Sequence, residues 1–352
     1  MINFIEVENF RCFRELRLTG LKQFNVVVGD SGSGKTALLE AIFLLSGASP
    51  EVWMRLRQWR GSGSLIRLTG TRASYESLFR DIFFDFDKSR GANFRLVGDR
   101  GVARSLKIHY PNQERLALHV KADASAPAEN AFLIDPIVFH WKTKGKEMKA
   151  KVETKEGVIK YSGFNTVYPA WYSSPVVNDA AMIAPMFSEL SLKKKAASLI
   201  RAVSALFPYV EDVTLESIAG EPTLCVSMES VSEKVPIGNI SSGLNKFLSI
   251  MTAIAANEGG VLLIDEFEVG FYYSTLPKLL ESIIAFCEEH RTQIFATTHS
   301  YEFLQALLPI MKAREDTEHA FALLRSQKQK KEATLRVLQN PAAAIASNFE
   351  VR

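Results

Sequence analysis

The chain has 352 residues, of which 47% are hydrophobic and 23% charged, so it is globular and long enough for one large α/β domain with an inserted lobe or for two modest domains. Its 42 basic and 39 acidic residues leave a formal net charge of +3, which neither requires nor excludes a nucleic-acid partner. The N-terminus lacks a secretion signal and no apolar run approaches 18 residues, so we expect a cytoplasmic protein without a membrane partner. Three scattered cysteines argue against a disulfide framework or a zinc site.

The N-terminal elements change from strand to helix around a glycine-rich turn. Alternating apolar and polar residues predict a strand at 2–7, and two further strands at 16–20 and 24–29. After Lys35 the apolar residues recur at helical spacing, which gives the order strand, loop, helix. From 96 to about 161, alternating segments separated by short polar turns predict a run of antiparallel strands.

The second half of the chain alternates between helices and strands. Residues 185–206 have helical periodicity but are too few for the long coiled-coil arms of chromosome-structuring ATPases. Further elements follow in the order helix after Ser242, strand 261–265, helix 274–287, strand 292–298 and helix after Ser300. This alternation predicts a mostly parallel sheet with helices on its faces, and the last dozen residues read as a loosely held tail.

The predicted organisation is a single α/β domain over residues 1–352 with four sub-parts. These are an N-terminal lobe with the glycine-rich loop (1–50), an antiparallel β insert (51–180), a helical segment (181–235) and a C-terminal part (236–352). The insert carries no motif that indicates a function.

The glycine-rich turn matches the pattern GxxxxGK[ST]. It consists of Gly29, Asp30, Ser31, Gly32, Ser33, Gly34, Lys35 and Thr36. The strand before it and the helix after it are the context that a phosphate-binding loop requires, because backbone N–H groups and the helix N-terminus then face the phosphates. We therefore expect ATP here, with Lys35 bridging the β- and γ-phosphates and Thr36 ligating Mg²⁺.

Two acidic residues follow the apolar strand 261–264. Asp265 is the expected second Mg²⁺ ligand, bound directly or through water. Glu266 lies just beyond the strand end, where it would polarise the water that attacks the γ-phosphate. Together with the phosphate loop, the pair predicts a Mg²⁺-dependent ATPase, which we expect to be slow.

A Ser/Gly sequence opens the helix that precedes this strand. Ser241, Ser242 and Gly243 alone would indicate only a helix N-cap. Their position shortly before the acids resembles the signature motif of ABC ATPases, with Ser242 standing where the common pattern has glycine. The resemblance implies that Ser241 and the helix N-terminus close over the γ-phosphate held by another subunit, so that the working unit is a homodimer or a larger homo-oligomer.

His299 ends the strand 292–298, at the edge where open α/β sheets bind ligands. It matches the switch histidine of ABC ATPases, which implies a contact with the γ-phosphate. A structural role is the interpretation for the other five histidines, which are His109, His119, His140, His290 and His319.

Two more segments carry a resemblance to one branch of ABC ATPases. Residues 9–13 look like the N-F-R opening of the RecF, SMC and OLD (overcoming lysogenization defect) group, which places Arg11 near the nucleotide. Residues 265–274 resemble the D-E-x-E-x-G-x-H run of OLD-like ATPases, with Tyr272 in place of the histidine. By its order along the chain, Gln58 is a candidate for the Q-loop glutamine.

OLD nucleases append a metal-dependent Toprim domain, for which the roughly fifty residues after His299 leave no room. The acidic Asp85–Asp87 segment is interpreted as a solvated turn. The chain thus resembles stand-alone OLD-like ATPases of bacterial anti-phage systems such as PARIS. That resemblance implies a switch or scaffold for a separately encoded effector, a nuclease or toxin, with a phage protein as a candidate trigger.

Two alternatives stay open. The first is a RecF-like ATPase that binds DNA in repair or recombination, using the basic residues Arg55, Arg57, Arg60, Arg67, Lys193, Lys194 and Lys195. The second is the nucleotide-binding subunit of a transporter, which the N-F-R opening and the run at 265–274 disfavour.

Overall fold

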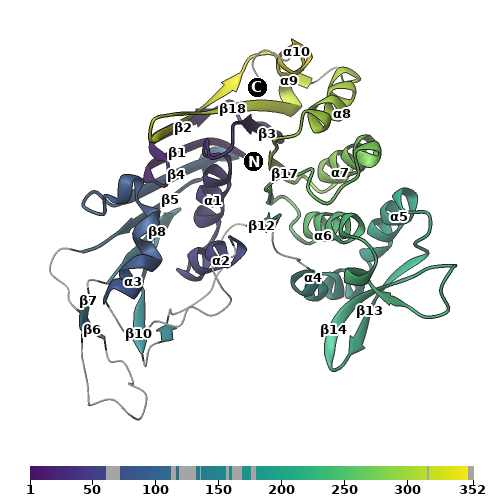
Figure 1. Ribbon diagram of the computed structural model, residues 1–352, viewed down its shortest axis with the longest axis horizontal. Helices are drawn as coiled ribbons and strands as arrows, with labels where there is room; N and C mark the ends of the chain where they lie inside the picture. Colours follow the sequence, from purple (N-terminus) through teal and green to yellow (C-terminus); the bar gives the residue numbers. More distant parts are fainter. Residues whose placement is uncertain are drawn as a thin grey trace.

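The computed structural model describes residues 1–60, 72–111, 116–118, 132–134, 136–155, 158–160, 169–175, 180–314 and 317–347. Two six-stranded sheets dominate these residues, one mostly parallel and one antiparallel. They face each other across the helix that follows the phosphate loop (Figure 1).

The mostly parallel sheet carries the phosphate loop. Its strands, in spatial order, are β12 (Ala170–Ser173), β16 (Val261–Ile264), β17 (Gln293–Thr297), β3 (Phe24–Gly29), β18 (Phe321–Gln329) and β19 (Glu332–Leu338). The first five run parallel and β19 returns antiparallel to β18. Every residue of β16 and β17 is buried, as expected for parallel strands covered on both faces. Their carboxyl ends lie at one edge of the sheet, together with that of β3.

The antiparallel sheet covers the phosphate-loop helix. Its order is β2 (Phe13–Thr19), β1 (Ile2–Phe10), β4 (Ala92–Gly98), β5 (Ala103–His109), β8 (Val138–Thr143) and β9 (Lys146–Lys151). Helix α1 (Lys35–Ser46) lies between the two sheets, and 11 of its 12 residues are buried. At its carboxyl end, Trp141 Nε1 donates to Leu44 O at 3.2 Å and Arg104 Nη2 donates to Gly47 O. The antiparallel sheet thereby satisfies carbonyls that a helix end otherwise leaves unpaired.

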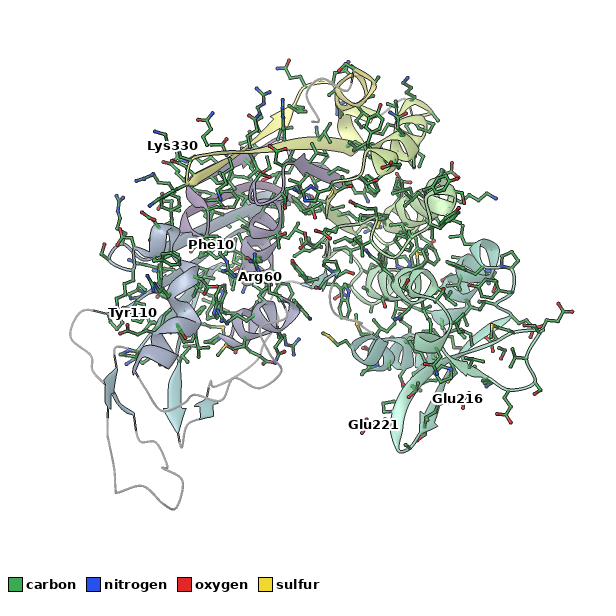
Figure 2. The ribbon with its side chains drawn as sticks, in the orientation of Figure 1. Phe10, Arg60, Tyr110, Glu216, Glu221 and Lys330 are labelled. Atoms are coloured by element: carbon green, nitrogen blue, oxygen red, sulfur yellow. The ribbon has the colours of Figure 1, made fainter. Side chains whose placement is uncertain are left out.

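A layer of helices covers the other face of the parallel sheet (Figure 1). It consists of α6 (Ser242–Ala256), α7 (Leu276–Glu289) and α8 (Tyr301–Lys312), with α4 (Ala180–Leu192) and α5 (Ala196–Leu206) beyond α6. Strands β13 (Asp212–Ile218), β14 (Glu221–Ser227) and β15 (Val235–Pro236) form a small sheet beside these helices. Figure 2 labels Glu216 and Glu221 on this hairpin, away from α1.

Shorter elements complete the described chain. They are the helices α2 (Glu51–Trp59), α3 (Arg72–Phe79), α9 (Thr317–Ala320) and α10 (Pro341–Ser347), the 3-10 turns η1 (Arg80–Ile82), η2 (Phe84–Phe86), η3 (Asp99–Gly101), η4 (Ile237–Asn239) and η5 (Tyr273–Thr275), and the strand pairs β6 (Leu116–Leu118) with β7 (Phe132–Ile134) and β10 (Glu153–Lys155) with β11 (Val158–Lys160). None of the helices in the described ranges is both long and apolar enough to cross a membrane.

The α/β class and the mostly parallel sheet are confirmed, while several local expectations were wrong. Helices α2 and α3 occupy the start of the segment expected to form an antiparallel β insert (51–180), and β12 from its end joins the parallel sheet. The segment 181–235 contains β13 and β14 as well as helices. The helix expected at 185–206 is broken at Lys194, whose φ of 58° is left-handed. The expected loose tail forms α10 over Pro341–Ser347, where Ile345 is fully buried.

Candidate functional site

A cleft of about 610 Å³ opens at the carboxyl edge of the parallel sheet, beside the phosphate loop. Its size is within the range of about 300–1,000 Å³ that is usual for small-molecule sites. Most of the nucleotide-site residues expected from the sequence line it, namely Arg11, Ser31, Gly32, Gly34, Lys35, Thr36, Asp265, Glu266 and His299. Gly29, Asp30 and Ser33 belong to the same loop without lining the cleft.

Glycine is required at two positions of the loop because its neighbours come very close. A Cβ on Gly29 would lie 2.1 Å from Ser326 O of the adjacent strand β18, and its φ is 136°. A Cβ on Gly34 would lie 2.9 Å from Cys12 Sγ, with φ at 106°. The buried Ser33 is fixed as well, since its carbonyl accepts a hydrogen bond of 2.6 Å from Ser326 Oγ. The loop therefore rests on β18 on one side and on the β1–β2 turn on the other.

Lys35 is held inside the loop by backbone oxygens. Its ammonium donates to Gly29 O at 2.7 Å and to Asp30 O at 2.9 Å, and it lies 3.4 Å from Nδ1 of His299. Burial lowers the pKa of Lys35 to about 8, partly offset by the nearby charge of Asp265. A phosphate anion at this place would restore the charge that burial disfavours.

Asp265 is the most tightly held acid of the cleft. Thr36 Oγ1 lies 3.0 Å from both of its carboxylate oxygens, and Thr297 Oγ1 donates to Oδ1 at 2.6 Å. The Tyr172 hydroxyl donates to Oδ2 at 3.4 Å. Neighbouring ligands of an octahedral Mg²⁺ lie about 3 Å apart, because Mg²⁺–oxygen distances are about 2.1 Å. The Thr36 and Asp265 oxygens thus fit a Mg²⁺ ion in both chemistry and spacing.

Glu266 is positioned by its backbone. Its φ of 48° is left-handed, a conformation that costs a non-glycine residue on the order of 1–3 kcal/mol and that clusters at functional sites. Its N–H donates to Thr297 Oγ1 at 2.9 Å, and the Lys246 ammonium of α6 donates to the carbonyls of Glu266, Phe267 and Val269 at 2.8–3.0 Å. The loop after the acids is therefore attached both to β17 and to α6.

His299 is exposed at the cleft, just past the end of β17. Its backbone N–H donates to Oε1 of Glu268 at 2.9 Å, which joins it to the same acidic loop. The other Glu268 oxygen is buried without a hydrogen-bond partner in the described part of the chain.

Arg11 lines the cleft, yet its guanidinium is already paired. It binds Glu40 at 3.1 Å and Asp81 at 2.5 Å, and it lies 4.6 Å from the Trp53 ring centroid. Arg60 also binds the buried Glu40, at 2.5 Å, but keeps 42% of its side chain exposed. Figure 2 labels Arg60 near the centre of the molecule, and this residue, which follows α2, lines the cleft. Of these two arginines, Arg60 is therefore the more open to a bound anion.

The Ser/Gly sequence lies outside this cleft. Ser241 caps α6 by accepting a 3.1 Å hydrogen bond from the Leu244 N–H, and both Ser241 and Ser242 are exposed. Gly243 lies against the loop after the acids, where a Cβ would be 2.9 Å from Gly270 O. The helix end is thus free to approach another molecule.

The remaining candidates divide. Gln58 is exposed and does not line the cleft, so the structure does not bring it to the site. The segment from Asp85 to Asp87 is a solvent-exposed turn as expected, and Asp85 in addition lines the cleft and pairs with Lys331 at 2.9 Å. Sequence reasoning missed Thr297, Lys246 and Tyr172, and it considered Arg60 only as a contact for DNA. The polar Thr297 at the end of an apolar strand was the one available signal.

Two protein families match the chain. One described as "AAA ATPase domain" matches residues 1–114, which hold Arg11 and the phosphate loop. One described as "AAA domain, putative AbiEii toxin, Type IV TA system" matches residues 229–305, which hold Ser241, the two acids and His299.

The chain is also similar to individual proteins and to a solved structure. An "ATP/GTP phosphatase" from Helicobacter pylori is 23% identical over 342 residues, 90% of each chain. An "OLD nuclease" from Thermus scotoductus is 38% identical over 73 residues, 21% of this chain and 13% of the nuclease. The RecF protein of Idiomarina loihiensis is 48% identical over 44 residues, 12% of each chain. The structure of an SMC head bound to the C-winged helix domain of ScpA aligns with 97% of this chain over 98% of its own length, with a TM-score of 0.55. At 11% sequence identity, this is a similarity of fold.

Proposed function

We propose, for a chain that is an ABC-type ATPase of the OLD, RecF and SMC kind, that two copies close around ATP and that hydrolysis reopens them. One observation carries the proposal. The groups expected to bind phosphate and metal line one cleft of a single chain, whereas Ser241 and Ser242 are exposed at the N-terminus of α6, outside that cleft, with the partly buried Gly243 beside them. A second copy that presents its own α6 N-terminus would add N–H donors and partial positive charge at the γ-phosphate.

The proposed chemistry is Mg²⁺-dependent ATP hydrolysis. The Thr36 hydroxyl and the Asp265 carboxylate would hold Mg²⁺, which supplies charge neutralisation at the β- and γ-phosphates. Glu266 orients a water molecule and takes up its proton as the water oxygen bonds to the γ-phosphorus. The bond from that phosphorus to the bridging oxygen breaks, and ADP and phosphate leave. His299 and Lys35 bind the γ-phosphate oxygens, and Arg11 supports the wall of the cleft through Glu40.

The closing step is tested by trapping it. Glu266→Gln with ATP and Mg²⁺ is expected to sediment as a dimer or larger homo-oligomer, and the double variant Ser241→Arg, Glu266→Gln as a monomer. A monomeric Glu266→Gln chain at saturating ATP would contradict the proposal. Ser198→Arg in the same background, on α5, is the matched control and should leave the dimer intact.

We further propose that this cycle controls a separately encoded effector in anti-phage defence, with a phage protein as trigger. The family description that names a toxin–antitoxin system and the OLD nuclease among the relatives support this role. The test is to co-purify the chain with the product of a neighbouring nuclease or toxin gene, with ATP and without. ATP-dependent association supports the role, and equal recovery from both preparations counts against it.

The second candidate function is DNA binding, but the basic residues expected to contact DNA are not the ones that favour it. The arginines expected to bind DNA pair with acids instead, Arg55 with Glu51, Arg57 with Asp81 and Arg60 with Glu40. Arg67 lies outside the described residues, while Lys193 and Lys195 pair with Glu189 and Glu258. Within the described ranges, Lys194 forms no ion pair, and a group of basic residues without acidic partners lies on the antiparallel sheet.

On that sheet Lys107, His140 and Lys149 are neighbours across β5, β8 and β9. Lys107 and Lys149 are exposed and form no ion pair within the described ranges. The pKa of His109 is lowered mainly by burial, and the nearby charges of Lys107, His140 and Lys149 lower it further. Such a face fits a phosphate backbone.

Fluorescence anisotropy with double-stranded DNA at increasing salt tests this alternative. Lys107→Glu with Lys149→Glu should lower the affinity and flatten its salt dependence, while Lys193→Glu should change neither. Unaltered binding by the double variant would rule out this face.

A further inference from the structure

The cleft has a second end that the phosphate chemistry does not use. The two acids and His299 follow β16 and β17, on one side of β3, whereas β18 and β19 lie on its other side. The pairing of β18 with β3 ends at Ser326 opposite Gly29, so the β18–β19 hairpin extends past the end of β3 beside the phosphate loop. Lys328 near the end of β18 and Lys330 and Lys331 of the β18–β19 turn line the cleft, and Figure 2 labels Lys330 at the tip of this hairpin.

The wall of this second end is the turn η2, with Phe84, Asp85 and Phe86. It is attached to the first strand by the bridge between Phe83 and Phe10, so its place relative to the phosphate loop is fixed. Phe84 is buried, but 55% of Phe86 is exposed. The exposed part of this ring buries no apolar surface on folding, and at the mouth of a polar cleft it is open to contact with a ligand.

The turn also holds a strained backbone. Asp85 and Phe86 are consecutive non-glycine residues in the left-handed region, with φ of 48° and 62°. Strain of this kind persists only where surrounding contacts impose it. Here Lys331 binds the Asp85 carboxylate at 2.9 and 3.2 Å, and the Arg80 guanidinium lies 4.5 Å from the Phe86 ring centroid. These contacts keep the ring exposed at a fixed place in the cleft.

We propose that Phe86 is the stacking platform for the base of the bound nucleotide, and that Lys328 and Lys330 face its ribose and α-phosphate. The inference rests on the proposed function at the phosphate end. A triphosphate bound at Lys35 with its γ-phosphate toward the acids after β16 directs the nucleoside to the opposite side of β3, the side of β18. That side has an exposed aromatic ring and two lysines that form no ion pair in the described chain. Purine nucleotides are the expected ligands, since their larger rings offer more stacking area than pyrimidines.

Calorimetry on the full chain with two probes, ATP and inorganic triphosphate, separates the two ends of the cleft. Phe86→Ala is expected to lower ATP affinity by about 5- to 100-fold, the range that corresponds to stacking of one base, and to leave triphosphate affinity unchanged. Phe86→Trp should retain ATP affinity. Tyr209→Ala, an exposed aromatic residue outside the cleft, is the matched control and should change neither affinity.

The outcomes are distinct. Unchanged ATP affinity in Phe86→Ala overturns the inference, and so does an equal loss of ATP and triphosphate in a folded Phe86→Ala chain. Lys35→Ala should lose both probes. If the unaltered chain binds neither, the phosphate site itself is wrong and the base site falls with it.

Discussion

The two ends of the cleft are built in different ways. At the phosphate end, the strands β3, β16 and β17 stop at one edge, and Asp265 is fixed by two threonine hydroxyls and a tyrosine. At the other end, a strained turn and a hairpin tip are joined by the ion pair of Asp85 and Lys331. Groups that act on a reacting phosphate need a rigid frame, which regular elements supply better than turns. The comparison predicts that small changes at the phosphate end strongly reduce the rate of ATP hydrolysis, whereas changes at the other end reduce ATP affinity by moderate factors.

Removing the ammonium at the phosphate end is the most severe test. Lys35→Ala should weaken ATP binding by at least about 100-fold, because two charge-assisted hydrogen bonds to phosphate are lost. Calorimetry with ATP and Mg²⁺ measures this, and unchanged thermal unfolding without nucleotide serves as the control for folding. Normal affinity would move the nucleotide to another part of the molecule.

The next change separates chemistry from binding at the same end. Glu266→Gln should reduce kcat by about 10²- to 10⁴-fold, the usual contribution of a general base, with ATP affinity retained. Single-turnover phosphate release gives the rate. Turnover at the level of the unaltered chain would remove Glu266 from its proposed role.

A subtler variant tests whether the frame matters. Thr297→Val keeps the shape of the side chain but removes the hydroxyl that donates to Asp265 and accepts from the Glu266 N–H. We expect kcat to fall roughly tenfold and ATP affinity to change little, since about 1–2 kcal/mol of positioning is lost. Thr298→Val, the next residue on the chain, is the matched control. Equal kcat values for the two variants would show that this hydroxyl is dispensable.

The smallest expected effect is one of pH. With the pKa of Lys35 lowered to about 8, the free chain loses this ammonium as the pH rises past 8, whereas a bound triphosphate favours the charged form. ATP affinity should therefore be constant below pH 8 and weaken above it, by at most about tenfold per pH unit. Proton uptake on binding at pH 8.5, seen as a buffer-dependent calorimetric enthalpy, is the confirming measurement. A flat affinity between pH 7 and 9.5 would contradict the shift.

The phosphate end was largely predictable from sequence because its residues sit at strand ends within local patterns. The loop at 29–36, the two acids and His299 each follow an apolar strand, and parallel strands bring such positions to one edge. The α/β class was predictable for a related reason, because apolar strands alternate with amphipathic helices along the second half of the chain.

The second end was not predictable, because its contacts join distant segments. Lys331 meets Asp85 across 246 positions, and no local pattern announces that the turn at 84–86 faces a hairpin near the C-terminus. The short strand β12 escaped notice because four residues carry little periodicity, and with it Tyr172 was missed. The pairing of Arg11 with Glu40 and Asp81 likewise depends on tertiary contacts.

The hydrogen bonds from Lys246 to three carbonyls of the loop after the acids link α6 to the catalytic base of the same chain. The helix whose N-terminus would reach the nucleotide of one copy also sets the backbone of Glu266 in its own chain. In the proposed dimer, occupancy of one site therefore adjusts the catalytic base of the other. ATP turnover should then rise sigmoidally with ATP concentration, with a Hill coefficient above 1, and Lys246→Met should return the curve to a hyperbola.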